Sequence, residues 1–294
     1  LEIYKGNIPA KFGGRLSSVF DISTKKGSTE KFKGEGSIGP VTGNLTFEIP
    51  IVKKIRKSIP FKLKGIKTVT RTEAPRFTEV SENVILIDIK DIDAFSYSKG
   101  DGVLIVMPCI DTKMGIEAAE FLNRRAGMDC KIVVVNDTKR IGFINVLNKT
   151  TARAKVRYVI YLAQDAYPCI DWLKLAYETL EKSGNGLLAF NDGKWRGRIA
   201  GFGMVRVDWV KKIYGNNILF PGYNAHKADN EITVIARVLN SFDYNADCTL
   251  VEIDKLKVFK ENIPADKELF RTRFRNGFDG LIPLEKLKPF AEEY

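Results

Sequence analysis

Residues 103–108 (VLIVMP), 131–137 (KIVVVND) and 158–162 (YVIYL) are three short apolar runs that decide the fold. Apolar runs of this length, without polar alternation, are typical of strands buried on both faces of a parallel sheet. Residues 83–89 (NVILIDI) form a fourth run of the same kind. Together these runs predict the core of an α/β domain.

Segments rich in helix-forming residues separate the runs. Residues 114–125 (MGIEAAEFLNRR) stop before Gly127, and residues 171–182 (DWLKLAYETLEK) stop before Gly184, so both predict helices ended by glycine. Residues 141–154 predict a further helix. The alternation of strands and helices predicts a mostly parallel, Rossmann-like sheet flanked by helices, which binds ligands beyond the carboxyl ends of its strands.

The first fifty residues follow a different pattern, an alternation with period two that is broken by glycine and proline. This pattern predicts short antiparallel strands. A basic stretch with little periodicity comes next. We therefore expect a short β-rich segment at residues 1–54, a basic linker at 55–72, and the α/β domain at 73–294.

The charge is concentrated in the same N-terminal part. The chain has 47 Lys and Arg against 36 Asp and Glu, a net charge of +11, and residues 1–70 alone hold 14 against 5. The remainder is nearly neutral and has no helix-turn-helix pattern or basic motif interleaved with aromatic residues, which argues against nucleic acid as a partner. No run of eighteen apolar residues occurs, so we expect no transmembrane helix.

Three acidic residues lie at or shortly after the ends of predicted strands. Asp111, Asp137 and Asp165 each come where a buried strand ends. Carboxylates at this edge of a parallel sheet can accept hydrogen bonds from a nucleotide or hold a divalent cation. Aspartate is also common in ordinary turns, so a purely structural role is an alternative for each of the three.

Five segments, in this order, are similar to those of glycosyltransferases with the GT-A fold, of the family 2 type. They are VLIVMPCIDTKMGIEAAEFLNRRAG (103–127), IVVVNDTKRIGFINVLNKTTARA (132–154), RYVIYLAQDAYPCIDWL (157–173), GRIAGFGMVRVDWVKKIYG (197–215) and KADNEITVIAR (227–237). The resemblance covers about residues 103–278. It implies a GT-A fold and an enzyme that moves a sugar from a nucleotide-sugar donor to an acceptor hydroxyl, with inversion and with the assistance of a metal.

The resemblance also implies roles for individual residues. Asp137, Asn148 and Asp165 would bind the donor, Asp165 and His226 would hold a divalent cation (Mn²⁺ or Mg²⁺), and Asp229 or Glu231 would be the general base. Asp111 is expected at the donor site with them because of its place at a strand end. The expected donor is a UDP-sugar. The acceptor would be a glycan, a lipid-linked molecule or a protein.

The sequence departs from the family pattern at the metal motif, where two or three carboxylates are usual and Gln164 precedes a single Asp165. A catalytically degenerate GT-A-like module that binds glycan or nucleotide is therefore an alternative function. Purely structural roles are alternatives at two further positions. His226 would then be an ordinary loop residue, and Asp229 would be a helix N-cap. The arginine-rich residues 267–278 could reach an anion or form a solvated helix face.

The N-terminal segment has a resemblance of its own. LEIYKGNIPAKFGGRLSSVFDISTKKG (1–27) and FKGEGSIGPVTGNLTFEIPIVKK (32–54) are similar to the end of the plug domain in TonB-dependent receptors, which are outer-membrane proteins of bacteria. A fragment of such a receptor is a third alternative, resting on residues 1–54 alone. For the α/β part we expect a cytoplasmic location, with peripheral membrane association left open.

Overall fold

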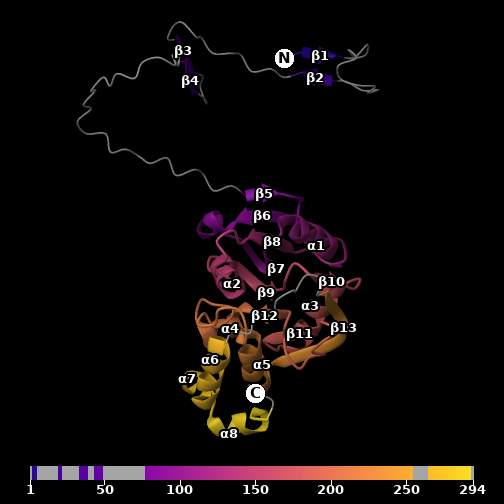
Figure 1. Ribbon diagram of the computed structural model, residues 1–294. Helices are drawn as coiled ribbons and strands as arrows, with labels where there is room; N and C mark the ends of the chain where they lie inside the picture. Colours follow the sequence, from indigo (N-terminus) through magenta and orange to yellow (C-terminus); the bar gives the residue numbers. More distant parts are fainter. Residues whose placement is uncertain are drawn as a thin grey trace, which may run out of the picture. The chain divides into compact units, whose positions relative to one another are not determined.

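The computed structural model describes residues 77–253 and 264–292, together with the backbone of four short strands before residue 50 (Figure 1). The chain divides into two compact units, Leu1–Arg71 and Thr72–Tyr294. In the first unit, β1 (Glu2–Tyr4) pairs antiparallel with β2 (Val19–Asp21), and β3 (Lys33–Ile38) pairs antiparallel with β4 (Gly43–Glu48). The expected short antiparallel strands are thus present. The expected linker at 55–72 lies outside the described residues.

The second unit is built on a nine-stranded sheet with the strand order β10-β13-β11-β12-β9-β7-β8-β6-β5. Its strands are β5 (Phe77–Glu79), β6 (Val84–Asp88), β7 (Ser98–Cys109), β8 (Lys131–Asn136), β9 (Lys155–Tyr161), β10 (Ala166–Pro168), β11 (Leu187–Asn191), β12 (Gly203–Arg206) and β13 (Phe242–Glu252).

The sheet is mostly parallel, as predicted. Strands β6, β8, β7 and β9 are successive parallel neighbours, and β11 is parallel to β13. Strand β12 runs antiparallel between β9 and β11, and β5 and β10 are antiparallel edge strands. The carboxyl ends of β7, β8 and β9 therefore meet at one edge of the sheet.

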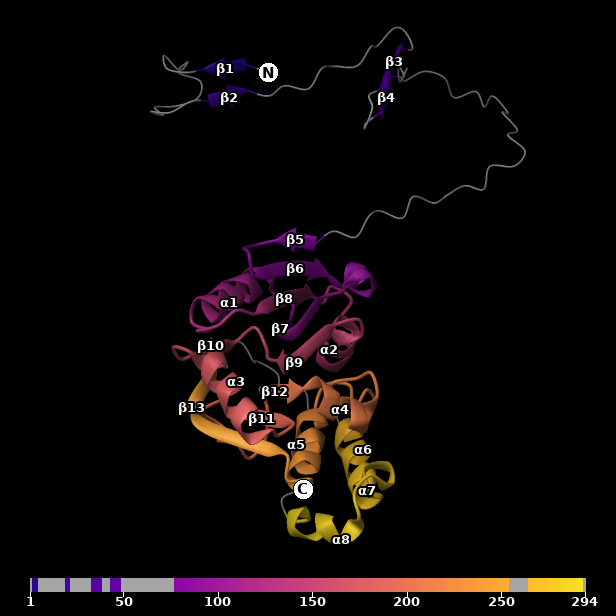
Figure 2. The ribbon, with the colours of Figure 1, turned by 180° about the vertical axis from the view of Figure 1, so that it is seen from behind.

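Helices cover both faces of this sheet (Figures 1 and 2). Helices α1 (Thr112–Arg124) and α3 (Trp172–Ser183) share one apolar core with alternate strand residues such as Ile105 and Met107. Helices α2 (Phe143–Thr151), α4 (Val207–Tyr214) and α5 (Ala228–Val238) share the other core with Leu104 and Val106. Because both faces are covered, the central strands are continuously apolar.

The chain ends in short helices that join the core containing α5. These are α6 (Pro264–Arg275), α7 (Gly277–Gly280), α8 (Leu284–Leu287) and the 3₁₀ helix η3 (Lys288–Phe290), and a further 3₁₀ helix, η2 (Ile89–Ala94), follows β6. Phe270 and Phe278 are the buried aromatic residues of this C-terminal part. Among the described residues, none of the helices has the length and apolar character needed to cross a membrane.

Candidate active site

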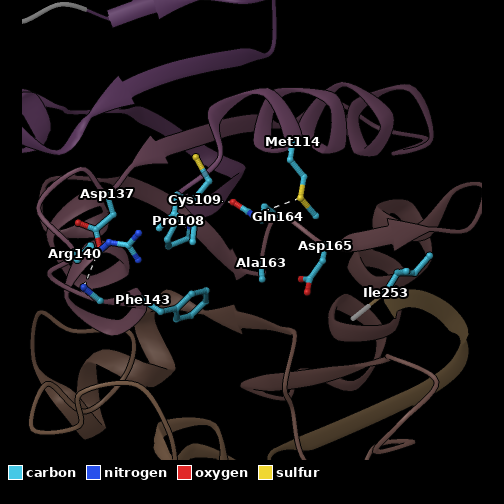
Figure 3. A pocket seen from close by; sticks show the side chains of 12 residues that line it. Pro108, Cys109, Met114, Asp137, Arg140, Phe143, Ala163, Gln164, Asp165 and Ile253 are labelled. Carbon is cyan, nitrogen blue, oxygen red and sulfur yellow. Dashed lines mark hydrogen bonds between the residues drawn. The ribbon is translucent and has the colours of Figure 1, made fainter. Parts of the chain in front are cut away.

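A cavity of about 370 Å³ opens where β7, β8 and β9 end (Figure 3). Its volume is in the range of small-molecule sites. The side chains around it come from the three strand ends, the loop after β8, the start of α1 and the end of β13. They are Pro108, Cys109, Ile110, Met114, Asp137, Arg140, Gly142, Phe143, Ala163, Gln164, Asp165 and Ile253. Two of the four residues expected to bind a donor, Asp137 and Asp165, are thus brought together.

Asp137 lines the cavity and also fixes the loop that follows it. The side chain is buried, with only 6% of the residue exposed. Its carboxylate accepts the backbone N–H groups of Ile141 at 3.0 Å and Gly142 at 2.9 Å. Gly142 has φ +91°, and a Cβ there would meet the carbonyl oxygen of Asn224 at 2.9 Å, so only glycine suits this turn. The loop wall of the cavity is therefore held by Asp137.

Gln164 and Asp165 follow β9 and have different surroundings. The Gln164 Oε1 accepts the backbone N–H groups of Ile110 at 3.1 Å and Asp111 at 3.3 Å, and its Nε2 donates to the Met114 Sδ at 3.5 Å. The amide thus bridges the end of β9 to the turn between β7 and α1. Asp165 is 8% exposed and lines the cavity, on the side away from Asp137 and Arg140 (Figure 3).

Asp229 lies in an adjoining cavity of about 150 Å³. The two cavities share Phe143 and Ala163 in their walls. Helix α5 begins at Ala228 with Lys227 as its N-cap, so Asp229 is inside the first turn, and the N-cap alternative is wrong. Burial raises the pKa of the Asp229 carboxyl, partly offset by the backbone N–H of Asn230, which donates to its Oδ1 at 2.9 Å. A carboxylate with a raised pKa is a stronger base than an ordinary one.

Glu231 is only two residues further along but lies in neither cavity. Its side chain is fully buried, and its two oxygens accept the Nε and Nη2 of Arg273, each at 2.8 Å. The hydroxyl groups of Tyr214 and Tyr223 donate to the same carboxylate at 3.1 Å and 2.6 Å. The structure therefore ties Glu231 to α6 and does not place it beside Asp137 and Asp165.

The remaining predicted residues stand outside both cavities. The exposed Asp111 caps α1, accepting the N–H of Met114 at 3.0 Å. The side-chain oxygen of the buried Asn148 accepts the backbone N–H groups of Ile218 at 2.9 Å and Leu219 at 3.1 Å. These bonds tie α2 to the loop between α4 and α5. His226 is exposed, and its backbone N–H donates to Asp266. The contacts of Asp111 and Asn148 are structural.

The expected metal ligands do not converge. Within residues 77–253 and 264–292, no three side chains of His, Cys, Asp or Glu are grouped so that they could hold a metal ion. Asp165 lines the larger cavity but His226 does not, and the Gln164 oxygen already accepts two backbone N–H groups. The donor set that the described residues offer therefore does not fit a cation held by protein side chains alone.

Two residues that contribute to the site were not singled out by sequence patterns. Arg140 lines the cavity from the loop after β8, and following that loop beyond Asp137 could have found it. Asp266, only 1% exposed, accepts the backbone N–H groups of Asn224, Ala225 and His226 at 2.8–2.9 Å. It lies about forty residues further along the chain, so no local signal points to this contact.

Comparison with known proteins identifies no family for the chain. No protein-family model matches it, and no curated protein sequence matches it significantly. The resemblances to family 2 glycosyltransferases and to the plug of TonB-dependent receptors thus stay predictions.

Several solved structures resemble the chain at low identity. TarS from S. aureus in complex with UDP-GlcNAc is 15% identical over 65% of this chain and 74% of that chain, with a TM-score of 0.43. Another TarS structure is 14% identical over 65% of this chain but only 42% of that chain, with a TM-score of 0.47. The mannosyltransferase PcManGT from Pyrobaculum calidifontis, in complex with GDP-Man and Mn²⁺, is 14% identical over 66% of this chain and 69% of that chain, with a TM-score of 0.44.

Proposed function

We propose that the α/β unit is a glycosyltransferase of the GT-A type, which moves a sugar from a nucleotide-sugar donor to an acceptor hydroxyl. One observation carries this proposal. Asp137 and Asp165 line a cavity at the carboxyl ends of parallel strands, and Asp229 lies in an adjoining cavity that shares the wall residues Phe143 and Ala163 with it. A donor cavity joined to a cavity with a basic carboxylate suits a reaction between two substrates.

The larger cavity is the donor site in this proposal. Asp137 accepts a hydrogen bond from the nucleotide, and the loop that it fixes forms one wall. Asp165 accepts a hydrogen bond from the ribose or the donor sugar. The expected donor is a UDP-sugar, and the nucleotide lies beyond the ends of β7, β8 and β9, as ligands do in open parallel sheets.

Asp229 is the general base. The acceptor hydroxyl gives its proton to the Asp229 carboxylate while its oxygen forms a bond to the anomeric carbon of the donor. The bond between that carbon and the diphosphate oxygen breaks, and the nucleoside diphosphate leaves with the electron pair. Attack from the face opposite the leaving group inverts the anomeric centre. A general base of this kind contributes about 10²–10⁴-fold to the reaction rate.

Isothermal titration calorimetry tests the donor site. UDP, GDP and their sugars are titrated into the protein and into Asp165→Asn. The Kd of the variant for the preferred nucleotide is expected to be about tenfold higher or more, because one charge-assisted hydrogen bond is lost. The matched control is Asp171→Asn, an exposed aspartate that lines neither cavity. Failure of every nucleotide to bind would overturn the proposal.

A catalytically inactive binding module is the second candidate. Gln164 favours this candidate. It stands where the metal motif usually has a carboxylate, and its amide oxygen is bound to backbone N–H groups in the turn between β7 and α1. The two candidates differ in turnover. The protein is incubated with a bound donor and simple glycan acceptors, and the products are analysed by mass spectrometry. If the protein is an enzyme, a new glycoside, or at least hydrolysed donor, is expected. Binding without either product would favour the module.

A further inference from the structure

The larger cavity contains one cationic side chain among the described residues that line it, Arg140. Its backbone N–H donates to the carbonyl oxygen of Asp137 at 3.0 Å, and its φ of +50° lies in the left-handed region. The turn that holds this backbone is closed by the two bonds from Ile141 and Gly142 to the Asp137 carboxylate. Asp137 therefore places the Arg140 side chain at the cavity wall.

Arg140 has no carboxylate partner within 4.0 Å in the described parts of the chain, 77–253 and 264–292, so its charge is available to a ligand. The side chain lies on the same side of the cavity as Asp137 (Figure 3). The guanidinium of arginine presents several N–H donors in a planar fork that matches phosphate oxygens. The residue type and its place both suit a phosphate group.

The two carboxylates of the cavity favour a cation beside a bound diphosphate. Asp137 and Asp165 put negative charge around the space where a donor diphosphate would lie, and like charges repel. A divalent cation usually offsets this repulsion, but Asp165 is the one predicted ligand that lines the cavity, and the Gln164 oxygen is held by the N–H groups of Ile110 and Asp111.

We propose that Arg140 binds the diphosphate of the donor in place of a divalent cation, so that a nucleoside diphosphate binds to this protein without metal. The inference rests on the proposed function and goes beyond it, since a glycosyltransferase can bind the diphosphate with a divalent cation or with a cationic side chain. The ligand class is a nucleoside diphosphate or a sugar ester of one. The guanidinium also stays beside the diphosphate as it leaves and offsets its growing charge.

Calorimetry of the full chain with UDP, GDP and uridine, in EDTA and then in Mn²⁺ or Mg²⁺, tests the proposal. The nucleoside diphosphate is expected to bind in EDTA, and either cation should change its Kd by less than about threefold. Arg140→Ala should weaken that binding by about tenfold or more, the worth of a charge-assisted contact. Arg140→Lys should lose less, because it keeps the charge without the fork.

Two controls separate the phosphate contact from general damage. Lys139→Ala removes the neighbouring cation, which is exposed and does not line the cavity, and should leave binding within about twofold. Uridine has no phosphate, so its binding should be equal in the wild type and in Arg140→Ala.

The outcomes also distinguish this inference from the proposed function. Binding of UDP or GDP that requires Mn²⁺ or Mg²⁺ would overturn the role of Arg140 and leave the donor site standing. Binding in EDTA that is unchanged by Arg140→Ala would do the same. Absence of nucleotide binding with and without metal would overturn both.

Discussion

The cavity beside β7, β8 and β9 differs from the buried network between α5 and α6 in how its charged groups are satisfied. In the network, the Glu231 carboxylate accepts Arg273, Tyr214 and Tyr223, and the Arg273 guanidinium also stacks 3.4 Å from the ring centre of Phe220. In the cavity, Arg140 is exposed and reaches no carboxylate within the described residues. Charges that the chain itself satisfies hold the fold, and charges that it leaves exposed in a cavity can meet a ligand.

The pKa values follow the same division. Burial alone would lower the pKa of Arg273, but the hydrogen bonds and charges of Glu231 and Asp279 raise it, so the guanidinium stays protonated. Burial raises the pKa of Tyr223, as does its hydrogen bond to Glu231. Asp229, on the same helix as Glu231, has a pKa raised by burial. One turn of α5 therefore holds a structural carboxylate and a candidate base.

The largest effect is expected from breaking the network. Glu231→Ala leaves the Arg273 guanidinium buried without its main partner, and we expect the free energy of unfolding to fall by about 3–5 kcal/mol. Urea denaturation followed by circular dichroism measures this. The control is Asp279→Asn, which removes the other carboxylate on Arg273. Its side chain is 64% exposed, so the loss should stay below about 1 kcal/mol.

Glu231→Gln keeps the side-chain shape if the alanine variant does not fold. Equal stability of Glu231→Gln and the wild type would contradict a structural role for this ion pair, and would reopen the possibility that Glu231 acts in catalysis.

The second effect concerns the other acid of α5. Asp229→Asn removes the proposed base, so the rate of sugar transfer should fall by about 10²-fold or more while nucleotide affinity stays the same. Because burial raises the pKa of Asp229, the base is protonated at a higher pH than an ordinary aspartate. Wild-type activity is therefore lost as the pH falls through that raised pKa, and the variant should lack this acid limb.

Asp208→Asn is the matched control, because Asp208 is an exposed acid in the first turn of α4 and lines neither cavity. Initial rates at a series of pH values separate the two variants. A pH profile of Asp229→Asn that keeps the acid limb would assign the limb to another group.

The α/β core could be predicted from local pattern. Residues 131–137 gave β8 and residues 158–162 lie largely in β9, because strands covered on both faces must be apolar throughout. The same logic placed Asp137 and Asp165 at one edge of the sheet, where both line the cavity. The antiparallel insertion of β12 between β9 and β11 depends on pairing between distant segments, which periodicity does not encode.

The fates of individual polar residues depended on distant partners. Asn148 accepts N–H groups from residues seventy positions later, and Arg273 pairs with a carboxylate forty-two positions earlier. The sequence shows that Arg271, Arg273 and Arg275 recur along α6. It does not show that Glu231 lies beside one of them in the folded chain. Arg271 is exposed, whereas Arg273 is buried beside Glu231.

Substitution of Asp266 is expected to have the smallest effect, and the direction of its pH dependence is clearly defined. Burial alone would raise the pKa of its carboxyl, but the N–H groups of Asn224, His226 and Ala225 outweigh burial and hold the pKa below its ordinary value. A carboxyl with a depressed pKa stabilises the folded state above its unfolded pKa of about 3.9, and this contribution is lost as the pH falls through the folded pKa.

Asp266→Asn should therefore lower the free energy of unfolding by about 2 kcal/mol at neutral pH, the worth of hydrogen bonds to a charged group, and by progressively less toward acid pH. Urea denaturation of both proteins across that range measures the difference. The control Ile282→Val removes one buried methylene and should cost about 1 kcal/mol at every pH. If the loss in Asp266→Asn were equally independent of pH, Asp266 would hold the loop by packing. A loss that shrinks with acid would show that its charge fixes the loop leading to Asp229.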